Sequence, residues 1–246
     1  MKQLVALSGL PRTGSTLLTS ILSQNPNIAA GPNSPLCQLA WDLAVSAERA
    51  ANEQMAASGR TVPQLLRQFA TAFYADTTQP IVVDKCRSWT LEPNMKLLRA
   101  MTPEPKVIVM VRPLEQVVAS LVAARSSAGW QGDIEGQLMR DGSEPIMRSL
   151  AGVEWARMNN SGEFLFVEYD DLVDQPEHTL ARIYEFCGWT PFAHDFTNIT
   201  NPTPEPDAIY GIDGFHDVRP TLGRRTIDVT LTQTTLDKCR LMERSR

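Results

Sequence analysis

The sequence lacks closely spaced cysteines. It has four, none of them in a C-x-x-C pair: Cys37, Cys86, Cys187 and Cys239. Metal sites with cysteine ligands and the disulfide frameworks of small secreted proteins both depend on short spacings between cysteines. We therefore expect no metal site and a reducing compartment.

Long apolar runs are also missing. The N-terminal run is only Leu4–Leu7, which is too short for the core of a signal peptide. No other stretch approaches the roughly 18 apolar residues that a membrane span needs. The sequence therefore predicts a cytoplasmic protein without a membrane segment.

Positive charge is not in excess. The formal net charge is −5, and the sequence pI is about 5.3. A general nucleic-acid-binding protein would need a basic face, so that class is excluded. A small anionic ligand remains compatible with this charge, because it needs only a local cluster of arginines and backbone N–H groups.

What is present indicates one soluble α/β domain over residues 1–246. Hydrophobic residues make up 43% and charged residues 21%, ordinary values for a globular protein of this length. Four short apolar runs, separated by helical patterns, predict buried parallel strands: Leu4–Leu7, Ile81–Val83, Val107–Val111 and Phe164–Val167. This alternation predicts a central, mostly parallel β-sheet with helices on both faces.

The sequence also contains one helix-capping pattern and two long segments without a clear helix or strand pattern. Thr61 and Gln64 form a capping-box pattern before an apolar helical stripe. Residues 126–143 are glycine-rich, and residues 190–226 are proline-rich. Loops of this length in a compact domain are usually lids or binding loops, so we expect lid or acceptor loops in both places.

The first predicted strand runs directly into the loop Gly9–Thr16 and then into a helix. A strand, a glycine-containing loop and a helix N-terminus form an anion cradle, because the loop N–H groups and the helix dipole point to one place. Gly9 and Gly14 have the spacing of the kinase P-loop, but Ser15 stands in place of its lysine. The basic residue is Arg12 instead, so the loop does not predict a working Walker A motif.

The run PRTGST resembles the 5′-phosphosulfate loop of sulfotransferases, and SGLPRTGSTLLTSILSQNP resembles the opening of the bacterial-type enzymes. These enzymes take a sulfuryl group from the nucleotide PAPS and release PAP, on a P-loop NTPase-like fold. The resemblance implies that Arg12 and the loop N–H groups hold the phosphosulfate. It also places Thr13, Gly14, Ser15 and Thr16 in the donor site.

A second motif follows the predicted strand Val107–Val111. In the family, an arginine at this strand end and a serine eight residues later bind the 3′-phosphate of the donor, and Arg112 and Ser120 match both. An arginine at the carboxyl end of a central strand suits a dianionic phosphate. The segment Val167–Leu172 resembles a Y-x-D-L segment whose tyrosine lies near the adenine. Tyr169 is the candidate for this tyrosine near the adenine. The alternative is that Tyr169 only packs in the core.

The segment GFHDVRPTLGRR resembles the tail of the bacterial-type enzymes. In cytosolic sulfotransferases a basic C-terminal loop closes on the 3′-phosphate. The RKG signature of that loop is absent here, so the resemblance offers Arg219, Arg224 and Arg225 as candidates for the same role.

The expected chemistry is an in-line displacement, helped by positioning and charge stabilisation. The transferring sulfonate carries less charge than a phosphoryl group, so fixed cations would suffice without a metal. The resemblance implies that Lys85 stabilises the bridging oxygen.

The general base is less clearly marked. The family's histidine base, two residues after Lys85, is replaced by Arg87. The run AGPNSPL lacks the glutamate that tyrosyl-protein sulfotransferases use. Asp84 is the nearest carboxylate and the candidate base, with a structural ion pair as the alternative; of the histidines, only His216 lies in a candidate closing loop.

The sequence therefore predicts a PAPS-dependent sulfotransferase. Its acceptor would be a hydroxyl or amine on a small molecule, glycan or peptide, and the sequence does not name it. Two alternatives stay open: a P-loop kinase or nucleotidyl transferase, and a non-catalytic nucleotide-binding module. Binding of ATP with Mg²⁺ in preference to PAP would favour the first, and PAP binding without turnover would favour the second.

Overall fold

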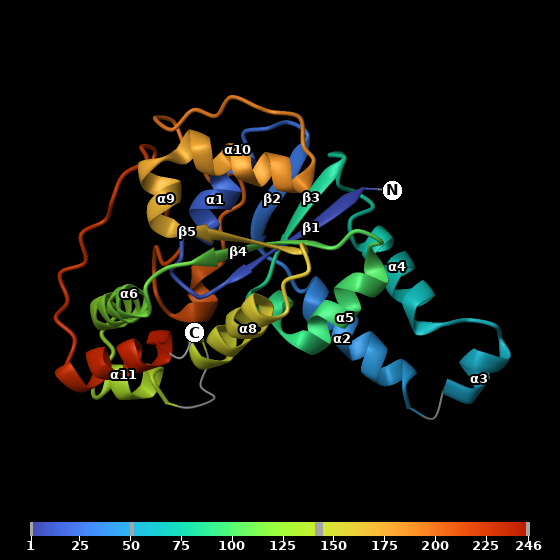
Figure 1. The fold of residues 1–246 in the computed structure, drawn as a ribbon, viewed down its shortest axis with the longest axis horizontal. Coiled ribbons are helices and arrows are strands. Elements are labelled where there is room, and N and C mark those ends of the chain that lie inside the picture. Colours follow the sequence, from blue (N-terminus) through green and yellow to red (C-terminus); the bar gives the residue numbers. More distant parts are fainter. Residues whose placement is uncertain (1, 50–51, 141–144, 245–246) are drawn as a thin grey trace.

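The computed structural model describes residues 2–49, 52–140 and 145–244. In these residues five parallel strands form a sheet in the order β2-β3-β1-β4-β5 (Figure 1). The strands are β1 (Gln3–Gly9), β2 (Ile28–Asn33), β3 (Ile81–Lys85), β4 (Lys106–Val111) and β5 (Phe164–Glu168). The expected fold class, a single α/β domain with a parallel sheet between helices, is confirmed.

The helices lie on both faces of this sheet (Figure 1). They are α1 (Ser15–Leu22), α2 (Leu36–Ala47), α3 (Asn52–Ala57), α4 (Val62–Phe73), α5 (Glu92–Met101), α6 (Leu114–Ser127), α7 (Ile134–Leu138), α8 (Met147–Met158), α9 (Tyr169–Asp174), α10 (Pro176–Cys187) and α11 (Gln233–Arg244). Two 3-10 helices are η1 (Arg87–Thr90) and η2 (Asp207–Tyr210). No helix in the described part of the chain is long and apolar enough to cross a membrane.

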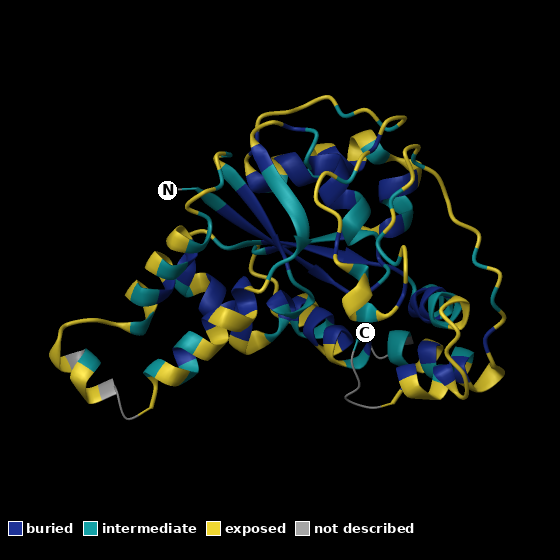
Figure 2. Cartoon of the chain, turned by 180° about the vertical axis from the view of Figure 1, so that it is seen from behind, coloured by how far each residue is buried: buried dark blue, intermediate teal, exposed yellow. Residues whose placement is uncertain are grey.

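Alternation along the strands builds two separate cores. Leu4 and Ala6 of β1 pack on one face with α2, α4, α5 and α8. Val5 and Leu7 pack on the other face with α1 and α10. Because both faces are covered, the central strands β1, β3 and β4 are buried except at their first residues. Exposed residues gather on the helices and on the long C-terminal segment (Figure 2).

A strand beyond the four expected ones, β2, lies at the edge of the sheet. It reads IAAGPN, and only Ile28 is fully buried. Glycine and proline weaken a strand pattern, but proline is tolerated at an edge, where one side of the strand makes no ladder bonds. The sheet in the described residues therefore has five strands, one more than the sequence predicted, and β2 pairs with β3 alone.

The two expected loops differ from each other. The first, residues 126–143, contains the end of α6 and all of α7, so it is not a plain loop. Asp133 caps α7 by accepting a hydrogen bond from the Gly136 amide at 2.8 Å; residues 141–143 lie outside the described part of the chain. The second, residues 190–226, contains only η2 as regular structure. The expected capping box at Thr61 and Gln64 is confirmed at the start of α4.

Candidate active site

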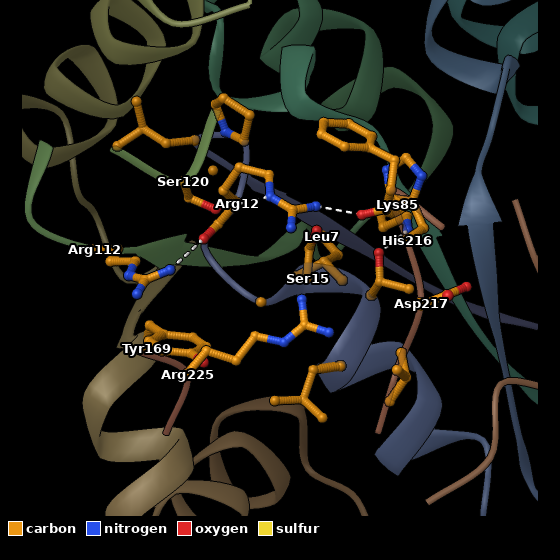
Figure 3. Close-up of a pocket in the computed structure, with 18 of the residues that line it drawn as sticks. Leu7, Arg12, Ser15, Lys85, Arg112, Ser120, Tyr169, His216, Asp217 and Arg225 are labelled. Carbon is orange, nitrogen blue, oxygen red and sulfur yellow. Dashed lines mark hydrogen bonds between the residues drawn. The ribbon is translucent and has the colours of Figure 1, made fainter. Parts of the chain in front are cut away.

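A cavity opens at the carboxyl ends of β1, β3 and β4, where parallel α/β sheets bind ligands. Its walls are the loop between β1 and α1, the ends of β3 and β4, and residues 215–227, which fold back over them (Figure 3). The cations that line it are Arg12, Lys85, Arg87, Arg112, Arg219 and Arg225. Asp217 is the one carboxylate among the lining residues that the structure describes. The site is therefore cationic although the whole chain carries a net charge of −5.

The loop between β1 and α1 turns back through two left-handed residues. Gly14 has φ 84° and Arg12 has φ 61°. Left-handed backbone is unusual for an arginine, and such residues gather at functional sites. No side chain caps α1, so its first N–H groups are free to face an anion in the cavity.

Gly14 cannot be replaced without displacing a neighbour. A Cβ atom at this position would lie 2.7 Å from a ring carbon of Tyr169. Tyr169, the first residue of α9, therefore packs directly against the loop and also lines the cavity. The sequence placed both residues in the donor site, and the structure brings them into contact.

Arg12 stands at the centre of the cavity (Figure 3). Its Nε donates to the Ser120 hydroxyl at 3.1 Å, and its Nη1 donates to the Phe215 carbonyl oxygen. Burial, aided by the charges of Arg225 and Arg112, lowers the pKa of Arg12 to about 10. The guanidinium is still charged at neutral pH, and an anion beside it would relieve the repulsion between these cations.

Arg112 and Ser120 approach Arg12 from β4 and α6. Arg112 Nη1 donates to the carbonyl oxygen of Arg12 at 3.1 Å, and its guanidinium lies 4.2 Å from the centre of the Tyr169 ring. Burial lowers the pKa of Arg112. The two motifs recognised in the sequence, about 100 residues apart, thus meet at one place.

The hydroxyl residues of the loop divide into two kinds. Ser15 and Thr16 line the cavity. Thr13 is fully buried and donates to the Leu10 carbonyl oxygen at 2.7 Å, so its side chain closes the turn instead. Thr13 therefore contributes through the shape of the loop and does not present its hydroxyl to a ligand.

Lys85, at the end of β3, is buried in an ion pair that the sequence did not indicate. Its Nζ donates to the Thr16 hydroxyl at 3.2 Å and to Oε1 of Glu205. The backbone N–H of Asn33 donates to the same carboxylate at 3.3 Å, and the Asn33 side-chain amide donates to it at 2.9 Å. Burial lowers the pKa of Lys85, and the charge of Glu205 opposes this effect.

Asp84 does not face the cavity, which corrects its assignment as the candidate base. Alternation along β3 turns it to the opposite face from Val83. Its Oδ1 accepts from the Trp89 indole at 2.6 Å, and its Oδ2 accepts from the Tyr74 hydroxyl. Burial raises the pKa of Asp84. These neutral partners make Asp84 a structural residue, and they also replace the ion pair considered as the alternative.

Arg224 and Arg225 lie in different surroundings. Arg225 lines the cavity and lowers the pKa of Arg12 through its charge. Arg224 is exposed and points to α9, where its Nε donates to Asp174 at 2.9 Å and its Nη1 lies 3.6 Å from Asp170. Arg224 therefore fastens the segment to the body of the protein and does not line the site.

Sequence reasoning missed Glu205 and Asp207, which come from the proline-rich segment. Asp207 accepts from His216 Nδ1 at 2.5 Å and from the His216 backbone N–H at 3.0 Å. His216 lines the cavity (Figure 3). The signal for it was weak: a histidine in a segment that resembles a closing loop. Within the described ranges, no cluster of three or more His, Cys, Asp or Glu side chains could hold a metal ion.

Comparisons with known proteins all find sulfotransferases or proteins that share their fold. The family model described as "Sulfotransferase family" matches residues 5–194. A Caenorhabditis briggsae protein named "Putative protein-tyrosine sulfotransferase" is 25% identical over 209 residues, which are 75% of this chain and 65% of that protein. This chain thus spans slightly less than two thirds of the length of the curated relative it matches.

Two solved structures share the fold. The sulfotransferase domain of the Synechococcus PCC 7002 olefin synthase has a TM-score of 0.53 and 17% identity, covering 99% of this chain and 96% of that one. A retinol dehydratase in complex with androsterone and the inactive cofactor PAP has a TM-score of 0.56 and 14% identity, covering 98% and 80%. At such identities the likeness concerns the fold.

Proposed function

The chain belongs to the sulfotransferase family, and on that premise we propose that it transfers a sulfuryl group from PAPS to a hydroxyl or amine acceptor and releases PAP. The observation that carries the proposal is the meeting of Arg12, Arg112, Ser120 and Tyr169 around one cationic cavity. A structural neighbour is a complex with PAP, and the two proteins share a fold.

The proposed donor site has two anion-binding parts. Arg12, Ser15, Thr16 and the free N–H groups of the loop and α1 hold the 5′-phosphosulfate. Arg112, Ser120 and Arg225 hold the 3′-phosphate, and Tyr169 lies by the adenine. Fixed cations and N–H donors at the place where charge develops are worth most in a site that excludes water, because there they need no reorganisation.

Lys85 is proposed to stabilise the bridging oxygen as the sulfonate leaves. It is already held beside Thr16 of the loop at 3.2 Å. The cations that face the cavity neutralise the departing phosphate, so the transfer needs no metal ion. The loop supports transfer without a metal ion, because Ser15 stands where a kinase P-loop has its lysine.

The acceptor and the location are proposed only by class. The acceptor is a small molecule, a glycan or a peptide, and segment 190–226 serves as the lid beside which it binds. Residues 126–143, which include α7, remain a second candidate acceptor region. The wide spacing of the four cysteines along the chain supports a reducing compartment such as the cytoplasm.

A thermal-unfolding panel of PAP, PAPS, ATP with Mg²⁺, and NAD tests the proposal. A ligand at 100 times its dissociation constant adds about 2.7 kcal/mol to the free energy of unfolding, which raises the melting temperature of a domain of this size by several degrees. We expect PAP to give this shift in the presence of EDTA. A shift with ATP and Mg²⁺ but none with PAP would replace the proposal with the kinase alternative.

A further inference from the structure

His216 is held by a carboxylate in the geometry that prepares an imidazole to accept a proton. Its Nδ1 contacts Asp207 Oδ1 at 2.5 Å, and its backbone N–H donates to Oδ2 of the same side chain at 3.0 Å. A carboxylate only accepts, so Nδ1 carries the hydrogen, and Nε2 of the neutral ring keeps its lone pair. Nε2 has no hydrogen-bond partner among the described residues, and the side chain is 12% exposed, in the wall of the cavity.

His216 of this pair lines the same cavity as Arg12 and Lys85, the two cations that are assigned to the reacting group. Arg12 donates to the carbonyl oxygen of Phe215, the residue before His216, and lies 4.5 Å from the centre of the Phe215 ring. Burial lowers the pKa of both Arg12 and Lys85, and the charge of Asp207 partly opposes this effect in each. The imidazole is therefore fixed where an acceptor would approach the transferring group.

We propose that His216, oriented by Asp207, is the general base of the reaction and that this base comes from the C-terminal segment of the chain. The inference rests on the proposed sulfuryl transfer. Arg87 occupies the position two residues beyond Lys85, and Asp84 faces the other side of the sheet. A histidine from the folded-back segment supplies the missing group.

The step balances without another reactant. The acceptor oxygen attacks the sulfur of PAPS, and the acceptor O–H proton moves to Nε2 of His216. The bond between sulfur and the bridging oxygen breaks, and its electron pair stays on the 5′-phosphate of PAP, beside Lys85. His216 then returns its proton to water when the products leave.

Glu205 is the rival carboxylate, and its contacts give it a different task. Its side chain is 1% exposed, with one oxygen on Lys85 and the other on the Asn33 amide. Glu205 thus balances the charge of Lys85, and it is not among the residues that line the cavity. Asp207 contacts the histidine, and Glu205 lies on the same segment. The charged residues that line the cavity with it are Arg12, Lys85, Arg87, Arg112, Asp217, Arg219 and Arg225.

The first measurement needs no acceptor. Long-range ¹H–¹⁵N NMR spectra of the full chain, with His216→Gln used for assignment, report which ring nitrogen of His216 carries hydrogen. We expect the Nδ1–H form when the ring is neutral, and a shift of the His216 signals when PAP is added. A neutral ring with hydrogen on Nε2 would overturn the proposal, because that nitrogen could not accept a proton. Failure of PAP to bind at all would instead count against the proposed function.

The second measurement uses turnover of ³⁵S-labelled PAPS with two probe acceptors, 4-nitrophenol and 4-methylphenol. A substantial fraction of 4-nitrophenol is ionised near neutral pH and needs no base, whereas 4-methylphenol is almost entirely protonated and does. We expect His216→Gln to lower turnover with methylphenol by roughly 10²–10⁴-fold, and turnover with nitrophenol by much less. The acid limb of the pH–rate profile for methylphenol should disappear, while PAP affinity stays close to that of the parent protein.

The exposed His178 offers a matched control. His178→Gln makes the same chemical change outside the site and should leave turnover and the pH profile as they are. Equal losses with both acceptors in His216→Gln would show a structural role and overturn the proposal. An acid limb that persists in His216→Gln and disappears in Glu205→Gln would transfer the role to Glu205.

Discussion

Arg12 connects the two sides of the site through one side chain. It reaches Ser120 on α6 and the backbone of Phe215 in the returning segment, and its own carbonyl oxygen accepts from Arg112. Its left-handed backbone is what turns the guanidinium into the cavity. A residue held by this many contacts is preorganised, which is what electrostatic stabilisation of a leaving group requires.

Arg12→Ala should therefore affect chemistry more than binding. Interactions that strengthen in the transition state appear in the turnover rate, and loss of one such group lowers turnover by roughly 10²–10³-fold. PAP lacks the sulfonate, so its affinity should change much less. Turnover and PAP affinity are measured on the same folded variant, with Arg60→Ala, an exposed arginine, as the control. Unchanged turnover would remove Arg12 from the site.

The ion pair of Lys85 and Glu205 makes a second prediction at this scale. Both side chains are buried, at 4% and 1% exposure. Glu205→Gln leaves a buried ammonium without its counter-charge, and breaking such a pair costs about 3 kcal/mol or more of unfolding free energy. Urea unfolding of the variant measures this loss.

The exposed pair of Glu92 and Lys96, at 3.0 Å, provides the control. Glu92→Gln should cost less than about 0.5 kcal/mol, because water and salt already screen the pair. If Glu205→Gln were as mild as this control, Lys85 would have another counter-charge, and its assignment beside the bridging oxygen would have to change.

At the scale of the element, the strand–loop–helix unit was predictable because its determinants are local. Leu4–Leu7 forms a strand through its own burial pattern, and Gly9 and Gly14 provide the turns that the loop needs. β2 was not predictable from its own residues, because Gly31 and Pro32 disfavour a strand and only pairing with β3 makes it one. α8 shows the same limit: it buries Ser149 and Gly152 along with apolar residues, so its sequence has no clear helical stripe.

Gly14→Ala tests how the loop and α9 fit together. The change adds strain at φ 84° and a Cβ atom 2.7 Å from the Tyr169 ring. We expect a lower melting temperature and PAP affinity reduced by more than about tenfold, since one charge-assisted contact alone is worth about 1.5–3 kcal/mol. Calorimetry with PAP measures the affinity.

Gly188 at the end of α10 allows the strain to be separated from the clash. It is also left-handed, with φ 71°, and a Cβ atom there would meet nothing within 4 Å. Gly188→Ala should cost roughly 1–2 kcal/mol of stability and leave PAP affinity unchanged. Equal PAP affinities in the two variants would contradict the packing of Tyr169 against the loop as part of the donor site.

At the scale of the molecule, the site is completed by a segment that returns from the far end of the chain. Glu205, Asp207 and His216 lie 120 or more residues after Lys85. No local pattern marks Glu205 or Asp207, and His216 is marked only by its place in a segment that resembles a closing loop. Their role depends on the backbone contacts that hold segment 190–226, such as Ile199 N–H to the Pro220 carbonyl oxygen at 2.6 Å. Arg12, Arg112 and Ser120 could be named from the sequence because each lies in a local motif that resembles the sulfotransferase family. The contacts of the returning segment could not be named, because they depend on how the fold places it.

The last prediction concerns this segment as a lid. Arg224 and Arg225 are exposed, but Arg224 is fastened to α9 and Arg225 lines the cavity, so we expect trypsin to cleave after them mainly when the segment opens. If the open form does not bind PAP, then PAP at 100 times its dissociation constant lowers the open population, and the cleavage rate, by about 100-fold. Arg60, in the connection between α3, which lies away from the sheet, and α4, is an internal control (Figure 1). Mass spectrometry of the fragments gives the rate of cleavage after Arg224 and Arg225 and the rate after Arg60 in one reaction. We expect PAP to slow cleavage after Arg224 and Arg225 and to leave cleavage after Arg60 unchanged. Equal slowing at all three places would indicate global stabilisation, and no slowing at Arg225 in saturating PAP would show that the segment does not close over the nucleotide.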